Sequence, residues 1–205
     1  MPEQIHIRKR FIAHLLFLTL GWALVLFGHY WLVPNANPRY WVAIFDPAVH
    51  GTIALLLIVP FYWWKRIDFK YLAVAVFLAV LIDVDHAIAA RSIRVEDMLS
   101  LPTRPIGHSV LFCAIISVSA ATILKYFFKS KKSFRLLIYL FFIALFSHIT
   151  RDAIHTDLTP WAYPFRLPPF SDLVFFTAFF VLNLAHLYYA FAKNNLPYWS
   201  WEESV

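Results

Sequence analysis

The sequence predicts an all-α protein that crosses a membrane about six times, with both termini in the cytoplasm. Of its 205 residues, 61% are hydrophobic and 19% are aromatic, a composition far outside the range of soluble globular domains. Apolar stretches long enough to cross about 30 Å of hydrocarbon recur along the chain, and basic residues gather in alternate loops between them. We therefore expect a polytopic integral protein of the cytoplasmic (inner) membrane.

Six apolar stretches each fit one membrane-spanning helix. The first follows Arg8-Lys9-Arg10, as a signal peptide would, but its apolar run is too long and no small-x-small cleavage site follows, so we expect it to be retained. No repeat or linker divides the chain, and residues 1–205 are expected to form a single transmembrane domain. The predicted spans are residues 11–33, 48–64, 71–90, 106–128, 134–150 and 173–192.

Aromatic and proline residues mark the ends of these spans. Tyr62, Trp63 and Trp64 lie at the predicted inner boundary of the second span, where aromatic side chains anchor helices at the membrane surface. Pro60 should shorten or kink that helix. Residues 156–170 contain four prolines and cannot span the membrane. This segment is either a lid over a site or an interfacial connection.

Charge placement predicts the orientation. The N terminus, the 65–70 turn, the 125–135 loop and the C-terminal tail carry twelve of the eighteen Lys and Arg residues, which the positive-inside rule assigns to the cytoplasm. Eight of the twelve acidic residues fall on the other side, the balance expected around a cation site. Because the net charge of +6 is explained by topology, no nucleic-acid partner is expected.

Seven residues with metal-binding side chains fall at the helix ends that this topology places at the outer side. Taken singly, each could be a helix-end carboxylate in water or a hydrogen-bonded histidine. Charged groups at membrane depth are costly unless they are paired or bound to a cation, so their convergence from four spans favours a metal site. They are His50, Asp83, Asp85, His86, His108, His148 and Asp152.

Spacing along the chain supports shared ligand faces. His148 and Asp152 lie four residues apart, which puts them on one helix face, and Asp83 and His86 lie three apart. Asp85 points elsewhere on a regular helix, so either it serves a second metal or the helix loosens there. Imidazole and carboxylate ligands without thiolate favour zinc, with manganese or iron as alternatives, and at least two ions are expected.

This ligand set indicates phosphoester chemistry. Metal pairs bridged by carboxylates activate water and neutralise phosphoryl oxygens. We expect Asp83 or Asp85 to act as general base and Arg104 to steady the developing negative charge. Arg151 either grips phosphate in the same way or pairs with an acidic residue or a lipid headgroup.

The remaining histidines have weaker claims. His14 and His186 lie toward the inner side and are expected to pack or to hydrogen-bond between helices. His29 ends the first span within plausible reach of the cluster. His155 could add a ligand or be an exposed loop residue.

Three motifs together resemble, in order and spacing, the YdjM-type family, described as LexA-regulated, membrane-bound, metal-dependent hydrolases. The family pattern has an early histidine, D-x-D-H, H-R-G-x-T-H-S and S-H-x-x-x-D before a Pro-rich segment, and the match covers roughly residues 48–168. The matching segments are Asp83-Val84-Asp85-His86, Arg104-Pro105-Ile106-Gly107-His108-Ser109 and Ser147-His148-Ile149-Thr150-Arg151-Asp152.

The resemblance implies a hydrolase core over residues 48–168. It also implies distant kinship with zinc-dependent phospholipase C and the single-strand-specific zinc nucleases, whose helical sites bind three zinc ions and cleave phosphoesters. This chain has Thr103 where the family motif begins with histidine, and Pro105 and Gly107 where it has Gly and Thr. One potential ligand is therefore missing, and two or three ions are expected.

We expect a membrane-embedded hydrolase that cleaves a phosphoester of a membrane lipid at the extracytoplasmic face, because a site at headgroup depth meets lipids first. The competing hypothesis is a metal-ion or proton-coupled transporter that uses the same cluster, although transporters place ionisable groups near the bilayer midplane. A haem protein would explain the histidines but not the aspartates. The sequence names neither the lipid nor the oligomeric state.

Overall fold

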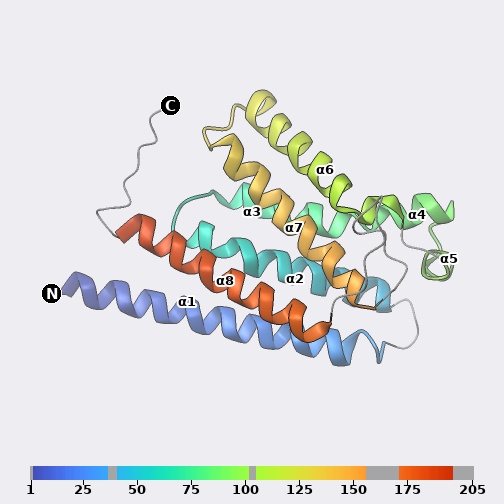
Figure 1. The fold of residues 1–205 in the computed structure, drawn as a ribbon, viewed down its shortest axis with the longest axis horizontal. Helices are drawn as coiled ribbons and strands as arrows, with labels where there is room; N and C mark the ends of the chain where they lie inside the picture. The colour runs from blue at the N-terminus through green and yellow to red at the C-terminus, as the bar shows by residue number, and fades with distance from the viewer. Residues whose placement is uncertain (1, 37–40, 102–104, 156–170, 196–205) are drawn as a thin grey trace.

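The computed structural model describes residues 2–36, 41–101, 105–155 and 171–195 (Figure 1). Within these ranges all regular structure is helical, and six stretches are long and apolar enough to cross a membrane. The predicted all-α fold with six spans is therefore confirmed. The six stretches are Lys9–Leu32, Val42–Trp63, Phe69–Ala90, Val110–Phe127, Phe134–Ile154 and Asp172–Ala192.

Several spans consist of more than one helical element. The first and fourth spans each end in a π-helical turn, and the third is divided into two helices by a short turn. The elements are α1 (Pro2–Phe27), η1 (Gly28–Leu32), α2 (Val42–Trp63), α3 (Phe69–Leu81), α4 (Val84–Ala90), α5 (Val95–Leu99), η3 (Ile106–His108), α6 (Val110–Thr122), η4 (Ile123–Phe127), α7 (Phe134–His155) and α8 (Asp172–Asn195).

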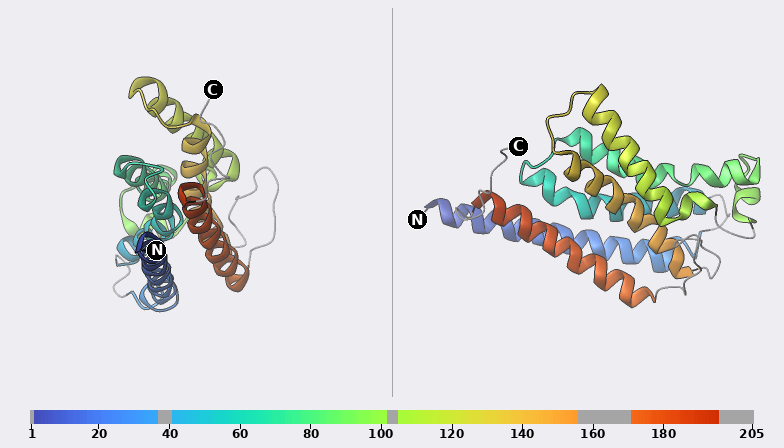
Figure 2. Two further views of the ribbon diagram at one scale, coloured as in Figure 1. Left: turned by 90° about the vertical axis from the view of Figure 1, so that its left-hand side faces the viewer. Right: turned by 45° about the horizontal axis from the view of Figure 1, so that its top comes forward.

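Helices α7 and α2 form the centre of the bundle. In the fifth span, formed by α7, 72% of the most apolar 18-residue segment is buried in the protein. The corresponding share is 22% for the first span and 17% for the fourth. Figures 1 and 2 show α1 and α8 side by side along one side of the bundle and α6 leaning on α7 along another. The peripheral helices expose apolar side chains such as Leu24 of α1 and Ile115 of α6, as helices surrounded by lipid do. The central position of α7 places its polar residues in the protein interior.

Away from the candidate site, hydrogen bonds made by polar side chains join α2 to its neighbours. We call this set the polar seam; it consists of Trp22, Tyr139, Asn183 and His186. Pro60 lacks an N–H, so the carbonyl of Leu56, four residues earlier, has no donor within the helix. Asn183 of α8 fills this role, donating from Nδ2 to Leu56 O at 2.5 Å while its Oδ1 accepts from Trp22 Nε1 at 2.9 Å. The helix therefore continues through Pro60 to Trp63.

His186 belongs to the same seam, one helical turn further along α8. Its Nδ1 donates to Leu57 O at 2.8 Å, and its Nε2 accepts from the Tyr139 hydroxyl. His14 stacks on Trp63 with ring centroids 4.2 Å apart. Both histidines thus have the packing and hydrogen-bonding roles predicted for them.

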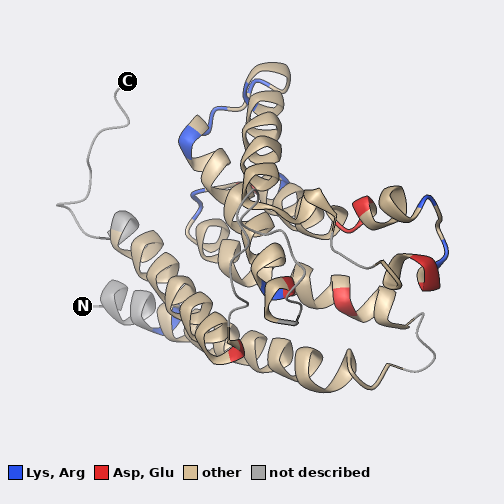
Figure 3. Ribbon diagram, turned by 45° about the vertical axis from the view of Figure 1, so that its right-hand side comes forward, with Lys and Arg blue, Asp and Glu red and all other residues tan. Residues whose placement is uncertain are grey.

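The two ends of the bundle differ in charge. The beginning of α1 and the end of α8 lie at one end (Figure 1), and most of the described acidic residues lie toward the other end, which carries α4, α5 and the end of α7 (Figure 3). The candidate ligands occupy this acidic end. Its assignment to the extracytoplasmic side stays a prediction from the distribution of Lys and Arg.

Candidate metal centre

A break in the third span directs the side chains of Asp83 and Asp85 toward the same His/Asp cluster. Helix α3 ends at Leu81 and α4 begins at Val84. Across the break, Asp85 N donates to Ile82 O and His86 N to Asp83 O, each at 3.1 Å, which is a tighter turn than an α-helix makes. The regular α-helix is therefore interrupted at this point, and both Asp83 and Asp85 reach the cluster. Asp85 also belongs to a separate ligand group, so features of both alternatives that the sequence left open are present.

The first ligand group consists of Asp83 from the third span, His108 just before the fourth span, and His148 and Asp152 from the fifth span. The Nε2 atom of His148 lies 3.2 Å from Asp83 Oδ1 and 3.6 Å from Asp152 Oδ2. The Nε2 atom of His108 lies 3.5 Å and 3.2 Å from the same two oxygens. Both imidazoles are fully buried, whereas the Asp83 side chain is 25% exposed, so solvent reaches the group from the Asp83 side.

These four nitrogen–oxygen separations are close to those between ligands of one metal ion. Ligand atoms about 2.0–2.2 Å from a tetrahedral zinc ion lie roughly 3.3–3.6 Å from one another. Within the described part of the chain, neither His108 Nε2 nor His148 Nε2 makes a hydrogen bond, although both are buried. Buried polar atoms without partners are costly, and a metal ion would satisfy them.

Asp85 and His86 extend the cluster on one side and form a second group with His108. Asp85 Oδ2 accepts from His108 Nδ1 at 3.1 Å, and Asp85 Oδ1 lies 3.2 Å from His86 Nδ1. A Cβ at Gly107 would lie only 3.0 Å from Asp85 Cγ, so the glycine is what allows the carboxylate to approach His108.

His108 is the residue that both groups share. Burial alone lowers the pKa of its imidazole, but contacts with the carboxylates of Asp152, Asp83 and Asp85 outweigh burial and raise that pKa well above its usual value of 6.5. Without a metal, His108 therefore holds a proton at neutral pH. A metal ion at Nε2 would displace that proton.

A third group consists of Asp46, His50 and Asp152. His50 Nε2 lies 3.2 Å from Asp152 Oδ1 and 3.7 Å from Asp46 Oδ2. Sequence analysis missed Asp46 as a candidate because it began the second span at residue 48, whereas α2 begins at Val42. The signal was present in the four-residue spacing of Asp46 and His50, the same spacing as that of the His148 pair.

Arg151 lies inside this third group. Its side chain is 3% exposed, and its Nη1 donates to Asp46 Oδ1 and to His50 Nε2, each at 2.6 Å. Its Nε donates to His29 Nδ1 at 3.3 Å. The pairing of Arg151 with an acidic residue, one of the predicted alternatives, is therefore present, and His29 contacts this arginine.

The structure brings together all seven predicted ligands, while other predictions fall outside the described residues. Arg104, Thr103 and the 156–170 segment lie in undescribed stretches, as does the side chain of His155. The roles predicted for Arg104 and for a lid therefore stay predictions.

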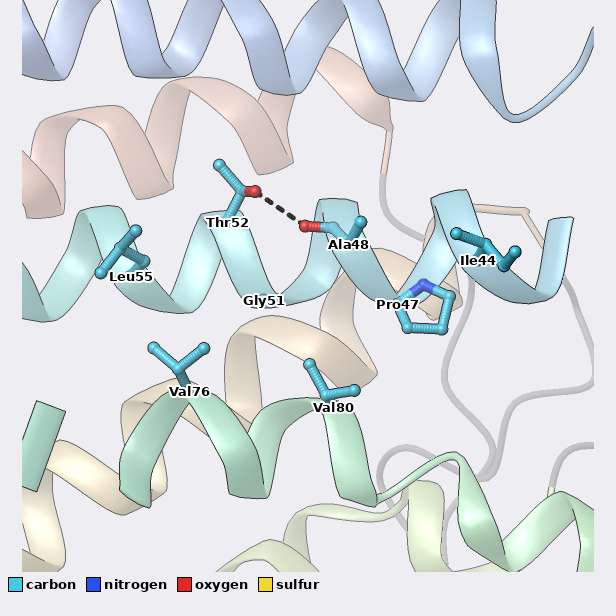
Figure 4. A pocket seen from close by; sticks show the side chains of 8 residues that line it. All are labelled: Ile44, Pro47, Ala48, Gly51, Thr52, Leu55, Val76 and Val80. Carbon is cyan, nitrogen blue, oxygen red and sulfur yellow. Dashed lines mark hydrogen bonds between the residues drawn. The ribbon is translucent and has the colours of Figure 1, made fainter. Parts of the chain in front are cut away.

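An apolar groove of about 460 Å³ lies between α2 and α3, beside the cluster (Figure 4). Gly51, which lines it, follows His50 in the chain, and Val80 precedes Asp83 by three residues. The Thr52 hydroxyl donates to the carbonyl of Ala48 at 2.7 Å, so even the polar side chain of the lining has its donor occupied within its own helix.

Fold and site together define a polytopic membrane protein with a His/Asp cluster that could hold metal ions. The chain belongs to the YdjM inner membrane protein family, whose sequence model matches residues 45–204. The family resemblance seen in the motifs is therefore confirmed.

Curated relatives carry a descriptive name only. The chain is 36% identical to mouse (Mus musculus) transmembrane protein 267 over 156 residues, covering 71% of this chain and 66% of the relative. It is 33% identical to the cattle (Bos taurus) protein of the same name, covering 64% and 61%. The chain thus spans slightly less than two thirds of the length of these two relatives. No solved structure matches the chain.

Proposed function

We propose that this protein is a membrane-embedded, metal-dependent hydrolase that cleaves a phosphoester of a membrane lipid. The observation that carries the proposal is the group of Asp83, His108, His148 and Asp152, whose nitrogen and oxygen atoms lie 3.2–3.6 Å apart in four pairings, close enough for one metal ion to bind them all. Two imidazoles and two carboxylates favour zinc, with manganese or iron as alternatives.

The ligand atoms are of the kinds that bind the divalent metal ion the proposal requires. Each histidine presents Nε2 to the centre, and His108 also donates from Nδ1 to Asp85, the arrangement that fixes the tautomer and orientation of metal-binding histidines. When bound, a divalent ion supplies a nucleophile from water at neutral pH and neutralises charge on phosphoryl oxygens.

Asp83 and Asp85 are assigned different roles. Asp83 holds one corner of the four-atom group, which leaves Asp85 as the better placed of the two predicted general bases. Its side chain is 19% exposed, and its Oδ2 accepts from His108 Nδ1. Arg104 is assigned to the developing negative charge of the phosphoryl group.

A lipid substrate is supported by the surroundings of the centre. The ligands lie at the ends of membrane-spanning helices, where a phospholipid headgroup would meet them, and the apolar groove beside Gly51 offers acyl chains a surface between α2 and α3. The bilayer itself is then the reservoir of substrate. The extracytoplasmic orientation comes from the distribution of Lys and Arg.

The test combines metal analysis with lipid hydrolysis on the full chain, purified without chelator. Wild type should carry at least one zinc, manganese or iron ion per chain and release phosphate or headgroup from phospholipid vesicles. His148→Ala should lose both properties. His186→Ala is the matched control, because it removes a buried histidine whose partners lie in the polar seam, and it should keep the metal.

Two results would contradict the proposal. Less than one bound metal per wild-type chain would remove the ligand assignment. Full metal occupancy with no product from vesicles of phosphatidylethanolamine, phosphatidylglycerol, cardiolipin or phosphatidic acid would remove the lipid phosphoesterase.

A further inference from the structure

The third ligand group differs from the first in already containing a cation. In the first group, the facing nitrogen and oxygen atoms have nothing between them among the described residues. In the third group, Arg151 Nη1 lies 2.6 Å from both Asp46 Oδ1 and His50 Nε2. A guanidinium is charged at every pH at which the protein is folded.

Arg151 and a metal ion would compete for His50 Nε2. Because Nη1 can only donate, His50 Nε2 accepts its hydrogen bond and must direct its lone pair at the guanidinium. A metal bound to His50 needs that same lone pair, and the Asp46 carboxylate, which faces His50 through Oδ2, is already paired with Arg151 through Oδ1 at 2.6 Å. The two cations are mutually exclusive at this position.

The guanidinium is fixed from more than one direction. Arg151 is buried in the most buried span and adjoins Asp152 in sequence, and its Nε donates to His29 Nδ1 from the first span at 3.3 Å. Leaving the group would separate the arginine from the Asp46 carboxylate, which is costly in a buried setting.

We propose that Arg151 takes the place of a metal ion in the group of Asp46, His50 and Asp152. The native centre then binds metal only through the groups around Asp83, Asp85 and His108, and His50 is a partner of Arg151. This inference rests on the proposed metal centre. It means that the protein binds fewer metal ions than the three ligand groups would allow.

Metal stoichiometry tests the inference directly, on the full chain loaded with excess zinc and washed. Arg151→Ala should bind one zinc more per chain than wild type, since it frees His50 Nε2 and Asp46. Arg151→Lys is the matched control, because it keeps a cation there and should keep the wild-type count. Arg151→Ala combined with Asp46→Asn should lose the additional ion.

A second variant tests the same point with the arginine retained. His50→Ala should leave the wild-type zinc count unchanged, whereas a metal-binding His50 would make the count fall. Circular dichroism of each variant, with and without zinc, reports whether the chain is folded.

Each outcome separates this inference from the function proposed above. Three zinc ions in wild type, or an equal count in wild type and a folded Arg151→Ala, overturns the arginine's role and leaves the hydrolase standing. No zinc in wild type but one in Arg151→Ala supports the arginine's role and removes the hydrolase. No zinc in either overturns both.

Discussion

Two sets of buried histidines occupy this bundle, and their partners differ. In the polar seam, His186 donates to the Leu57 carbonyl and accepts from the Tyr139 hydroxyl, so both ring nitrogens are used. In the candidate metal centre, His108 Nε2 and His148 Nε2 face carboxylate oxygens at 3.2–3.6 Å without forming hydrogen bonds to described residues.

The difference separates a structural histidine from a candidate ligand. The seam satisfies carbonyls of α2, including the one that Pro60 leaves without a donor, through hydrogen bonds from side chains of the protein itself. The centre gathers carboxylates around the Nε2 atoms of two buried imidazoles, an arrangement that could hold a metal ion. Burial alone does not distinguish the two sets, since His148 and His186 are both buried; hydrogen-bond satisfaction does.

Asp152→Ala should cause the largest change. Asp152 contributes an oxygen to the first ligand group and another to the third, and loss of a direct ligand should weaken zinc binding by at least about 100-fold, beyond the range for outer partners. Zinc titration followed by competition with a chelator measures this. An affinity within tenfold of wild type would contradict the distinction drawn between seam and centre.

Asp85→Ala should have a smaller effect on the ion in the first group. If Asp85 orients His108 through Nδ1, its removal should lower zinc affinity by about 10–100-fold. The same titration should be run beside Asp97→Ala, which removes a carboxylate of the α5 helix bonded to Ser92. Equal affinities for the two variants would show that Asp85 has no part in the centre.

Zinc affinity should fall as pH is lowered, by about tenfold per unit for one displaced proton. The sign follows from His108, whose raised pKa means that the metal-free protein holds a proton there up to a pH well above 6.5. Zinc must displace it, so affinity rises with pH until that pKa is passed and then levels off. Titrations between pH 6 and pH 9 check this, and a flat profile would contradict it.

In the metal-free protein, folding stability should change with pH in the opposite direction to zinc affinity. A raised pKa means that protonated His108 stabilises the folded state fully below its unfolded value near 6.5, and this stability is lost as pH rises through the folded pKa. Thermal melting of chelated and zinc-loaded protein over the same pH range should therefore diverge.

Asn183→Leu should have the smallest effect and act on stability alone. It leaves the Leu56 carbonyl and Trp22 Nε1 without the partners that Asn183 supplies, at an expected cost of about 1–2 kcal/mol. Unfolding in detergent measures the loss, and the zinc count should equal that of wild type. A reduced zinc count in this folded variant would show that seam and centre are coupled.

Much of this architecture could be predicted from local sequence. Span length and hydropathy are properties of contiguous residues, which is why the six spans and the helix ends that carry the ligands were found. Asp46 was missed because the predicted span began at residue 48, and the direction of Asp85 stayed open because hydropathy does not report a helix break between two apolar runs.

The sequence by itself determined that the chain crosses a membrane, and it determined which histidines and aspartates fall at one end of the bundle. Only the tertiary structure decided how they are grouped, because grouping depends on which side chains from different helices face one another. It brought the imidazoles of His108 and His148 and the carboxylates of Asp83 and Asp152 close enough for one metal ion, and it placed Arg151 against Asp46 and His50. The same residue types thus form one group that could hold a metal ion and, beside it, a group that already contains the Arg151 guanidinium.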